Sequence, residues 1–475
     1  MSTSQHPARR IHPAWWVALA TFLALFGAAG FRAAPGALMI PLHHEFGWSM
    51  WVMSLAVSVN LLLYGLVAPF AAALMQRFGV RRVVTAALAL VALGAAGSTL
   101  MNASWQLFVF WGVLIGGGTG AMALVLADTV ASRWFVRSRG LVMGVLTAGQ
   151  AAGQLVLLPP VASLADSVGW RSASLLIAAA ALIALIPVLL LLRERPSDLG
   201  VLPYGRRAPG AGHGTPGEAG PEGERTTSGA SVGEPLASRG EAPGGPDDGW
   251  AGEEGPAPGR GAAAGREAMR HALDVLRRAA KTRVFWALAG AFAICGATTN
   301  GLVGVHFIPS THDHGMPAAT AATLLAAVGV LDVAGTMASG WLTDRFDPRI
   351  LLGLYYGFRG VSLVLLPFLL SDAVHPSMVL FVVVYGLDWV ATVPPTAALC
   401  RQYFGEDSTV VFGWVFAAHQ VGAAIAAAAA GGVRELFGEY TYAWWGGAAL
   451  CVVAVVLSLA IGRRPGARSR VNAEA

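Results

Sequence analysis

The chain has 475 residues, of which 55% are hydrophobic and only 12% are charged. Soluble proteins average about 25% charged residues, so this composition excludes a soluble protein and predicts an integral membrane protein. The formal net charge of +5 does not indicate a nucleic-acid partner, because the arginines flank apolar runs as topology signals do. The three cysteines, Cys295, Cys400 and Cys451, lie far apart inside apolar runs, so we expect neither a disulfide framework nor a metal cluster.

Apolar runs of about 20 residues, the length that crosses a bilayer, occur six times on each side of a hydrophilic centre. We expect the first six spans at roughly 15–40, 50–75, 83–101, 105–130, 140–163 and 172–192. The other six are expected at roughly 284–308, 318–341, 350–370, 377–400, 409–432 and 440–462. Arginine-rich loops alternate with loops that hold only Arg171 and Arg434, so the positive-inside rule places both termini in the cytoplasm.

The spans predict an all-α membrane protein with twelve transmembrane helices in two pseudo-symmetric six-helix bundles. The bundles are residues 15–193 and 284–462, and the cytoplasmic tails are residues 1–14 and 463–475. We expect residues 194–265 to be a disordered cytoplasmic linker, because the stretch 205–265 contains 18 glycines and 8 prolines. Residues 266–283 predict an amphipathic helix that lies on the anionic inner leaflet, with apolar residues along one side and basic residues elsewhere.

A related motif follows the second span of each half. Residues 340–349 read GWLTDRFDPR, and residues 72–82 read AALMQRFGVRR. Both resemble the G-x-x-x-D-R-x-G-R-R loop of the major facilitator superfamily, although Gln76 replaces its Asp in the first copy and Asp347 replaces its Gly in the second. The resemblance implies the major facilitator fold and a cytoplasmic gate in which the motif's charged side chains pair with neighbouring helices. The gate residues implied are Gln76, Arg77, Arg81, Arg82, Asp344, Arg345 and Arg349.

A longer set of matches narrows the family. The segments Arg133-Trp134-Phe135, Arg139-Gly140-Leu141 and Gly169-Trp170-Arg171 are similar to the signature of the monocarboxylate transporters between their fourth and sixth helices. Bacterial relatives, including the oxalate–formate antiporter group, share this signature, and residues 195–200 resemble their segment after helix six. The resemblance covers nearly all of the chain outside the linker. It implies solute transport across a bacterial inner membrane by alternating access.

Asp332 is a carboxylate near the middle of the span 318–341. A charge at the bilayer centre costs about 3 kcal/mol, so Asp332 faces protein or water and marks a functional site. The alternatives are a protonated Asp that is hydrogen-bonded to a neighbouring helix and a structural ion pair. In monocarboxylate transporters the eighth helix carries an Asp followed four residues later by an Arg. The resemblance therefore implies proton coupling at Asp332, but Thr336 stands at the Arg position and the cation comes from elsewhere. The candidate charge partner is Arg359 in the ninth span, either functional or in a structural pair with Asp332.

Other polar side chains within the spans are candidates for substrate or proton binding. Arg32 lies toward the outer end of the first span, where a guanidinium suits bidentate binding of a carboxylate or snorkels to headgroups. His419 in the eleventh span is a second candidate for proton coupling, because histidine titrates near neutral pH, with a packing role as the alternative. The other substrate-binding candidates are Asn60, Gln150, Asn300, Tyr385 and Asp388.

These observations predict a secondary active transporter of a small organic anion, a monocarboxylate, coupled to protons. Oxalate-type members use cations on helices eight and eleven, where this chain has Asp332 and His419, so a dicarboxylate is disfavoured. The alternatives are an exporter of amphipathic compounds and a membrane sensor with a transporter fold. No enzymatic activity, cofactor or metal is expected, and the glycine run 116–120 lacks the lysine of a phosphate loop. The expected partners are the anion, protons and membrane lipid, without nucleic acid or an obligate protein partner.

Overall fold

The computed structural model describes residues 12–122, 124–136, 138–206 and 260–462, and this part of the chain is almost entirely helical. The first half comprises α1 (Pro13–Phe46), α2 (Met50–Phe78), α3 (Val80–Ser98), α4 (Ser104–Leu107), η1 (Phe108–Ile115), α5 (Gly116–Ala121), α6 (Leu124–Trp134), α7 (Arg139–Ser167) and α8 (Trp170–Leu191). The connecting elements are η2 (Pro196–Leu199) and α9 (Arg260–Ala279). The second half comprises α10 (Arg283–Gly296), η3 (Ala297–Val303), α11 (Gly304–Asp313), α12 (Ala318–Thr343), α13 (Pro348–Leu369), α14 (Pro376–Asp388), α15 (Val393–Phe404), η4 (Gly405–Asp407), α16 (Ser408–Phe437) and α17 (Thr441–Ala460).

Several of these elements join end to end into membrane-length spans. Within the described residues, ten helical stretches are long and apolar enough to cross a membrane, and one of them, Pro376–Phe437, holds two spans in succession. The stretches Ser104–Trp134 and Arg283–His312 each contain a π-helical segment, η1 and η3. With α7, whose outer part is a shorter apolar helix, these stretches account for the twelve predicted spans.

Local capping fixes where the spans begin and end. The Ser49 hydroxyl accepts a hydrogen bond from the amide of Val52 at 3.3 Å, which satisfies one of the free amides at the start of α2. Gly47 and Gly438 end α1 and α16 in the left-handed conformation, with φ of 66° and 77°. Glycine adopts this conformation without a Cβ clash, so the chain reverses at the membrane surface within a few residues.

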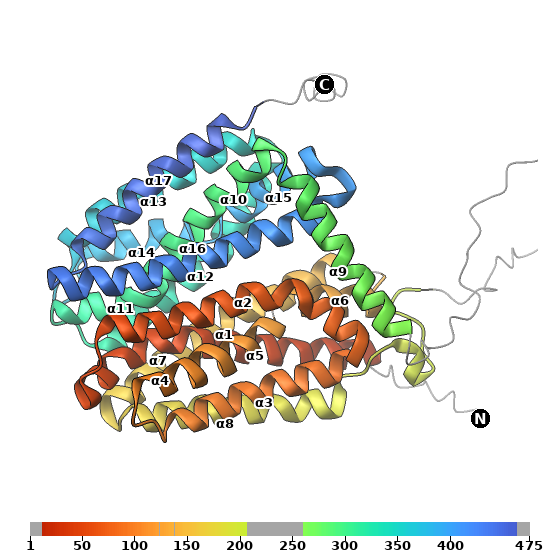
Figure 1. The fold of residues 1–475 in the computed structure, drawn as a ribbon, viewed down its shortest axis with the longest axis horizontal. Helices are drawn as coiled ribbons and strands as arrows, with labels where there is room; N and C mark the ends of the chain where they lie inside the picture. The colour runs from red at the N-terminus through yellow and green to blue at the C-terminus, as the bar shows by residue number, and fades with distance from the viewer. Residues whose placement is uncertain (1–11, 123, 137, 207–259, 463–475) are drawn as a thin grey trace, which may run out of the picture.

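The two halves lie side by side, with α2 of the first half packed along α16 of the second (Figure 1). We call the end at which α1 begins the inner end, after the distribution of arginines. At the outer end Leu158 and Ala162 of α7 share one apolar cluster with Ala321 and Ala322 of α12. The rings of His44 and His312 lie 6.4 Å apart there, across the two halves. These contacts close the outer end.

Residues 194–206 are ordered, which corrects the prediction that the linker begins at residue 194. The Glu194 carboxylate accepts hydrogen bonds from the amides of Val80 at 2.6 Å and Arg81 at 3.0 Å, and so caps the start of α3. Tyr204 pairs with Phe135 in a β-bridge. The prediction failed because these contacts join residues far apart in the sequence, and amino-acid composition carries no information about such long-range contacts. The rest of the predicted linker up to residue 259 lies outside the described residues.

The helix expected over 266–283 is present but shifted. α9 spans Arg260–Ala279, so it begins within the predicted linker and ends before Arg283, where α10 starts. It crosses the inner end of the molecule obliquely and lies against both α2 and α16 (Figure 1). α9 therefore contacts both halves of the protein.

Candidate functional site

The tenth span is broken near its middle. α14 ends at Asp388, and α15 begins at Val393, which Pro394 and Pro395 follow. Proline lacks an N–H group, so the carbonyls four residues before these prolines lose their helical donors. The prediction of one continuous span over 377–400 is wrong at residues 389–392, which form a turn between the two helices. Broken backbone at membrane depth must find other partners, and such breaks line binding sites in transporters.

α12 supplies two partners for the broken turn. The Ser339 hydroxyl donates a hydrogen bond to the carbonyl of Ala391 at 2.5 Å. The amide of Val390 donates to Oδ1 of Asp332 at 2.9 Å, and the Thr336 hydroxyl donates to the same oxygen at 3.0 Å. The face of α12 that carries Asp332, Thr336 and Ser339 therefore holds the break.

Asp332 is half-buried, and its second oxygen, Oδ2, accepts no hydrogen bond from any residue that the structure describes. An ionisable side chain at this depth faces protein or water and not lipid. Thr336, which stands where the resemblance places an arginine, donates one hydrogen bond to Asp332 and brings no charge.

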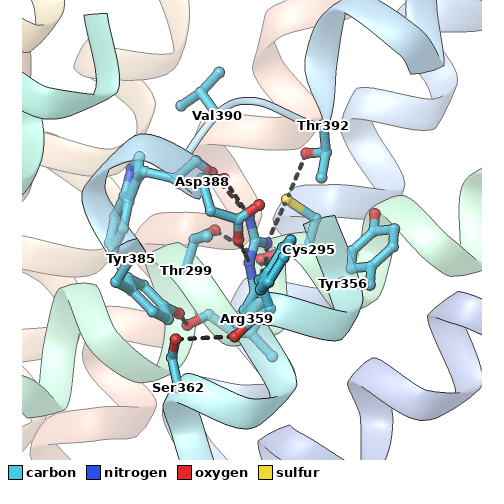
Figure 2. A network of polar contacts seen from close by, with 12 residues as sticks. Cys295, Thr299, Tyr356, Arg359, Ser362, Tyr385, Asp388, Val390 and Thr392 are labelled. Carbon is cyan, nitrogen blue, oxygen red and sulfur yellow. Dashed lines mark hydrogen bonds and ion pairs between the residues drawn. The ribbon is translucent and has the colours of Figure 1, made fainter. Parts of the chain in front are cut away.

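Arg359 of α13 also binds backbone groups of the broken turn (Figure 2). Its Nη2 donates hydrogen bonds to the carbonyls of Asp388 at 2.6 Å and Trp389 at 3.2 Å. Its Nε bonds Oδ2 of Asp388 at 2.7 Å in an ion pair whose side chains are 0% and 6% exposed. The ninth span therefore holds the end of α14 through its arginine.

The hypothesis that Arg359 pairs with Asp332 needs correction. The ion pair is made with Asp388, a residue that the sequence analysis proposed as a substrate ligand. Within the described part of the chain, Oδ1 of Asp388 is buried without a hydrogen-bond partner. Arg359 and Asp332 thus act on adjacent residues of one broken turn, the arginine on its carbonyls and the aspartate on its amide.

α10 and η3 supply the remaining contacts of the broken turn and of Arg359. The residues concerned, Cys295 and Thr298, were not among the predicted site residues. Nη1 of Arg359 lies 3.0 Å from Sγ of Cys295, which in turn lies 3.2 Å from the Thr392 hydroxyl (Figure 2). The Tyr385 hydroxyl donates to the carbonyl of Thr298 at 2.8 Å. The paired prolines Pro394 and Pro395 were the available signal for the break, but nothing local pointed to Cys295 or Thr298.

Close approach of α12 to α14 depends on Gly335. A Cβ at this position would lie 1.9 Å from the carbonyl oxygen of Leu387, so the two backbones are in contact. We expect Gly335→Ala to lower the melting temperature in detergent, because overpacking of a close contact costs about 1–3 kcal/mol. Gly340→Ala on the same helix is the matched control, since nothing lies within 4 Å of its Cβ position. Equal melting temperatures for the two variants would contradict the close contact.

The remaining candidates within the spans lie in different surroundings. The Asn60 amide donates to the carbonyl of Trp111 at 2.7 Å and so ties α2 to η1. Asn300 is half-buried in η3. The His419 ring lies between Phe292 and Phe416, at centroid distances of 4.9 and 5.7 Å, which supports the packing alternative. Proton coupling at His419 stays a prediction.

For three of the predicted site residues the structure describes the helix but not the side chain. Arg32 lies in α1, Gln76 in α2 and Gln150 in α7, but their side chains are outside what the structure describes. Substrate binding by Arg32 and Gln150 and gating by Gln76 therefore stay predictions.

The described arginines of the gate motif make contacts within their own half. Arg81 donates to the carbonyl of Leu189 at the end of α8, and Arg349 donates to the carbonyl of Ile461 after α17 at 2.7 Å. Arg349 also pairs with Asp347 at 2.5 Å.

The other described motif residues lie near the surface. Arg345 stacks on Trp341 with its guanidinium carbon 4.0 Å from the ring centroid, and Arg77 lies over Phe78 at 4.8 Å. Arg82 and Asp344 are exposed, and Asp344 forms no ion pair with any described residue. The described residues of the motif thus tie helices within each half, and none of their hydrogen bonds or ion pairs joins one half to the other.

Two packed halves of membrane-length helices, with a broken span and a carboxylate at its break, define a transporter that crosses the membrane many times. A sequence model of the Major Facilitator Superfamily matches residues 17–387 and 293–475. The chain belongs to the Major Facilitator Superfamily, and it is a multi-pass integral membrane transporter. The predicted family and fold class are thereby confirmed.

Similar proteins include transporters with and without an assigned substrate class. The uncharacterized MFS-type transporter YcxA of Bacillus subtilis is 25% identical over 454 residues, 94% of each chain. Monocarboxylate transporter 13 of Rattus norvegicus is 24% identical over 396 residues, which cover 82% of this chain and 74% of that protein. Monocarboxylate transporter 11 of Mus musculus is 33% identical over 174 residues, 35% of this chain and 37% of that protein.

Solved structures share the fold at low sequence identity. A bacterial homologue of the human lysosomal transporter Spinster, inward-facing and occupied, superposes with a TM-score of 0.65 at 14% identity, covering 94% of this chain and 96% of that one. The xylose transporter XylE from E. coli, in a partially occluded inward-open conformation, gives a TM-score of 0.62 at 12% identity, covering 95% and 98%. At these identities the likeness shows the fold alone.

Proposed function

We propose that this protein moves a small organic anion, a monocarboxylate, across the bacterial inner membrane by alternating access, coupled to protons. The observation that carries the proposal is Asp332, a half-buried carboxylate at mid-span whose Oδ1 holds the amide of Val390 in a broken helix. The relatives named as monocarboxylate transporters support the substrate class. The Arg359–Asp388 pair supports the site by fixing the other side of the same turn.

Proton uptake at Asp332 changes the strength of its contacts with the broken turn. A charged carboxylate accepts a hydrogen bond roughly twice as strong as a neutral acceptor does, so protonation loosens its bond to the amide of Val390. The same event removes the cost of a charge at mid-membrane. The proton state of Asp332 therefore biases the position of α14 and α15 relative to α12, which is the coupling that a proton-driven cycle requires.

The test is transport in proteoliposomes. A panel of radiolabelled mono- and dicarboxylates is offered with and without an imposed pH gradient, and counterflow is measured at equal pH. Accumulation of a monocarboxylate that follows the proton gradient supports the proposal. Absence of counterflow for every solute contradicts transport and favours the sensor alternative.

A second candidate function, export of amphipathic compounds, is favoured by one observation. A groove of about 460 Å³ opens between α10, η3, α16 and α17 and is lined almost entirely by apolar side chains. Such a surface suits a ligand with an apolar body. Under this alternative amphipathic cations and neutral compounds, added as competitors to the same panel, inhibit uptake as well as carboxylates do.

Arg32 is the proposed anchor of the carboxylate. We expect Arg32→Ala to abolish uptake of the preferred monocarboxylate and Arg32→Lys to keep part of it, because lysine retains the charge but lacks the bidentate fork. Initial uptake rates and retention on size-exclusion chromatography are measured for both variants. Normal uptake kinetics in a well-folded Arg32→Ala protein would rule out the anchor.

A further inference from the structure

α9 is docked firmly to the second half of the protein. Val275 and Ala279 are 1% and 3% exposed and belong to an apolar cluster that also contains residues of α10, α13, α15, α16 and α17. The indole nitrogen of Trp414 donates to the carbonyl of Ala272 at 3.0 Å. Arg278 pairs with Asp407 at 2.8 Å. This side of the helix is therefore occupied by protein.

α9 also packs against α2, in the first half. In Figure 1 the helix crosses the inner end of the molecule from the second half toward the first. A segment fixed to one half and lying on the other senses any change in their separation at this end. Its position therefore matters for a protein whose halves move against each other.

The remaining surface of α9 is both basic and apolar. Arg270 and Arg277 of α9 are exposed, as is Lys281 in the turn directly after the helix, and Met269 and Leu273 are 40% and 36% exposed. Arg277 is offset by Asp274 at 3.0 Å, whereas no described acidic residue lies within salt-bridge distance of Arg270 or Lys281. Exposed apolar side chains next to unpaired cations are the pattern of a helix that lies in the headgroup region.

The depth of α9 is marked by Trp286 in the first turn of α10. Its side chain is 61% exposed, and its indole nitrogen donates to the carbonyl of Ala280 directly after α9 at 2.8 Å. Exposed tryptophans concentrate at the boundary between hydrocarbon and headgroups. The end of α9 is therefore held at the level of the lipid headgroups, where its unpaired cations meet lipid phosphates.

We propose that α9 is a docking surface for anionic phospholipid headgroups of the inner leaflet, with Arg270 and Lys281 as the headgroup ligands. A purely solvated basic face would leave Met269 and Leu273 in water, whereas a headgroup site covers both the apolar and the basic residues. Because α9 lies across α2 and α16, lipid bound there is linked to the spacing of the two halves at the inner end. This site is independent of the transported solute.

The test places a fluorescent label on the proposed surface. Leu273→Cys is labelled with bimane, which is selective because Cys295, Cys400 and Cys451 are buried. The labelled full-length protein is reconstituted into nanodiscs of phosphatidylcholine with increasing phosphatidylglycerol. We expect a blue shift of emission that saturates with phosphatidylglycerol. In Arg270→Gln/Lys281→Gln the apparent affinity for phosphatidylglycerol, read from the midpoint of the shift, should fall roughly 30-fold, at about 1 kcal/mol for each charge removed.

The control removes two exposed arginines outside α9, in Arg195→Gln/Arg401→Gln, and should keep the shift. Size-exclusion chromatography confirms that each variant is folded. Equal emission with and without phosphatidylglycerol overturns the proposal. So does an equal loss in the control variant, which would assign the response to the whole inner surface. Inorganic phosphate added to phosphatidylcholine discs separates the sources, and a shift produced by phosphate alone overturns the assignment to lipid.

Discussion

Asp332→Asn abolishes proton-driven accumulation of the substrate while it leaves exchange at equal pH. Asparagine keeps an acceptor oxygen for the amide of Val390 and the hydroxyl of Thr336, so the broken turn retains its hydrogen bonds. It cannot take up or release a proton, so the coupling is lost. A pH step of one unit supports about tenfold accumulation of a solute moved with one proton. We expect the variant to show none of it in a pH-jump uptake assay, with counterflow preserved.

Two comparison variants separate the charge of Asp332 from its hydrogen bonds. Thr336→Val removes one donor to Oδ1 and keeps the carboxylate, so it should retain gradient-driven accumulation. Asp332→Ala removes the acceptor and leaves the amide of Val390 unpaired, so exchange should fall together with accumulation. Accumulation that persists unchanged in Asp332→Asn contradicts the coupling role and directs the search to His419 or Asp388.

The spans and Asp332 were predictable because each rests on a local signal. A run of about 20 apolar residues identifies a membrane helix without reference to its neighbours. A carboxylate within such a run can be recognised as a site residue because its charge is energetically costly inside the bilayer. Helical spacing also places Gly335 and Ser339 on the face of Asp332. In the structure Gly335 lies against α14, and Ser339 bonds the carbonyl of Ala391 in the broken turn.

The partner of Arg359 could not be read from the sequence in the same way. Asp332 and Asp388 both lie in neighbouring spans, and the choice between them depends on how α13 packs against α14 and α10. The break after α14 favours Asp388 as the partner of Arg359. The guanidinium binds the Asp388 carboxylate together with the backbone carbonyls of Asp388 and Trp389. Pro394 and Pro395 indicated the break, but the partners of the freed backbone groups come from three other helices.

The prediction that the linker starts at residue 194 failed for a related reason. The sequence from residue 194 is poor in long apolar runs, so it was grouped with the glycine-rich stretch that follows. Glu194 nevertheless caps α3 through the amides of Val80 and Arg81, and the resemblance to bacterial relatives around residues 195–200 had already suggested a shared segment. A cap supplied from more than 100 residues away has no signature at the capped helix.

Breaking the buried ion pair between Arg359 and Asp388 should cause a large loss of stability. Arg359→Gln or Asp388→Asn should each lower the melting temperature strongly, because removal of one partner leaves a buried charge or its hydrogen-bonding groups uncompensated, at about 3–5 kcal/mol. Arg359 is 0% exposed and also holds the carbonyls of Asp388 and Trp389, so its loss frees backbone groups at membrane depth. The measurement is thermal unfolding in detergent, read by loss of the monodisperse peak.

The matched control is the ion pair between Arg434 and Asp313 at the outer end, with the same 2.7 Å separation but side chains 29% and 28% exposed. Arg434→Gln and Asp313→Asn should cost about 1 kcal/mol or less, since exposed pairs contribute little. The charge-reversed double variant at Arg359 and Asp388 should not recover full stability, because an aspartate at position 359 cannot donate to the two carbonyls. Full recovery by that reversal would show that the pair acts through charge alone and that its hold on the broken turn is dispensable.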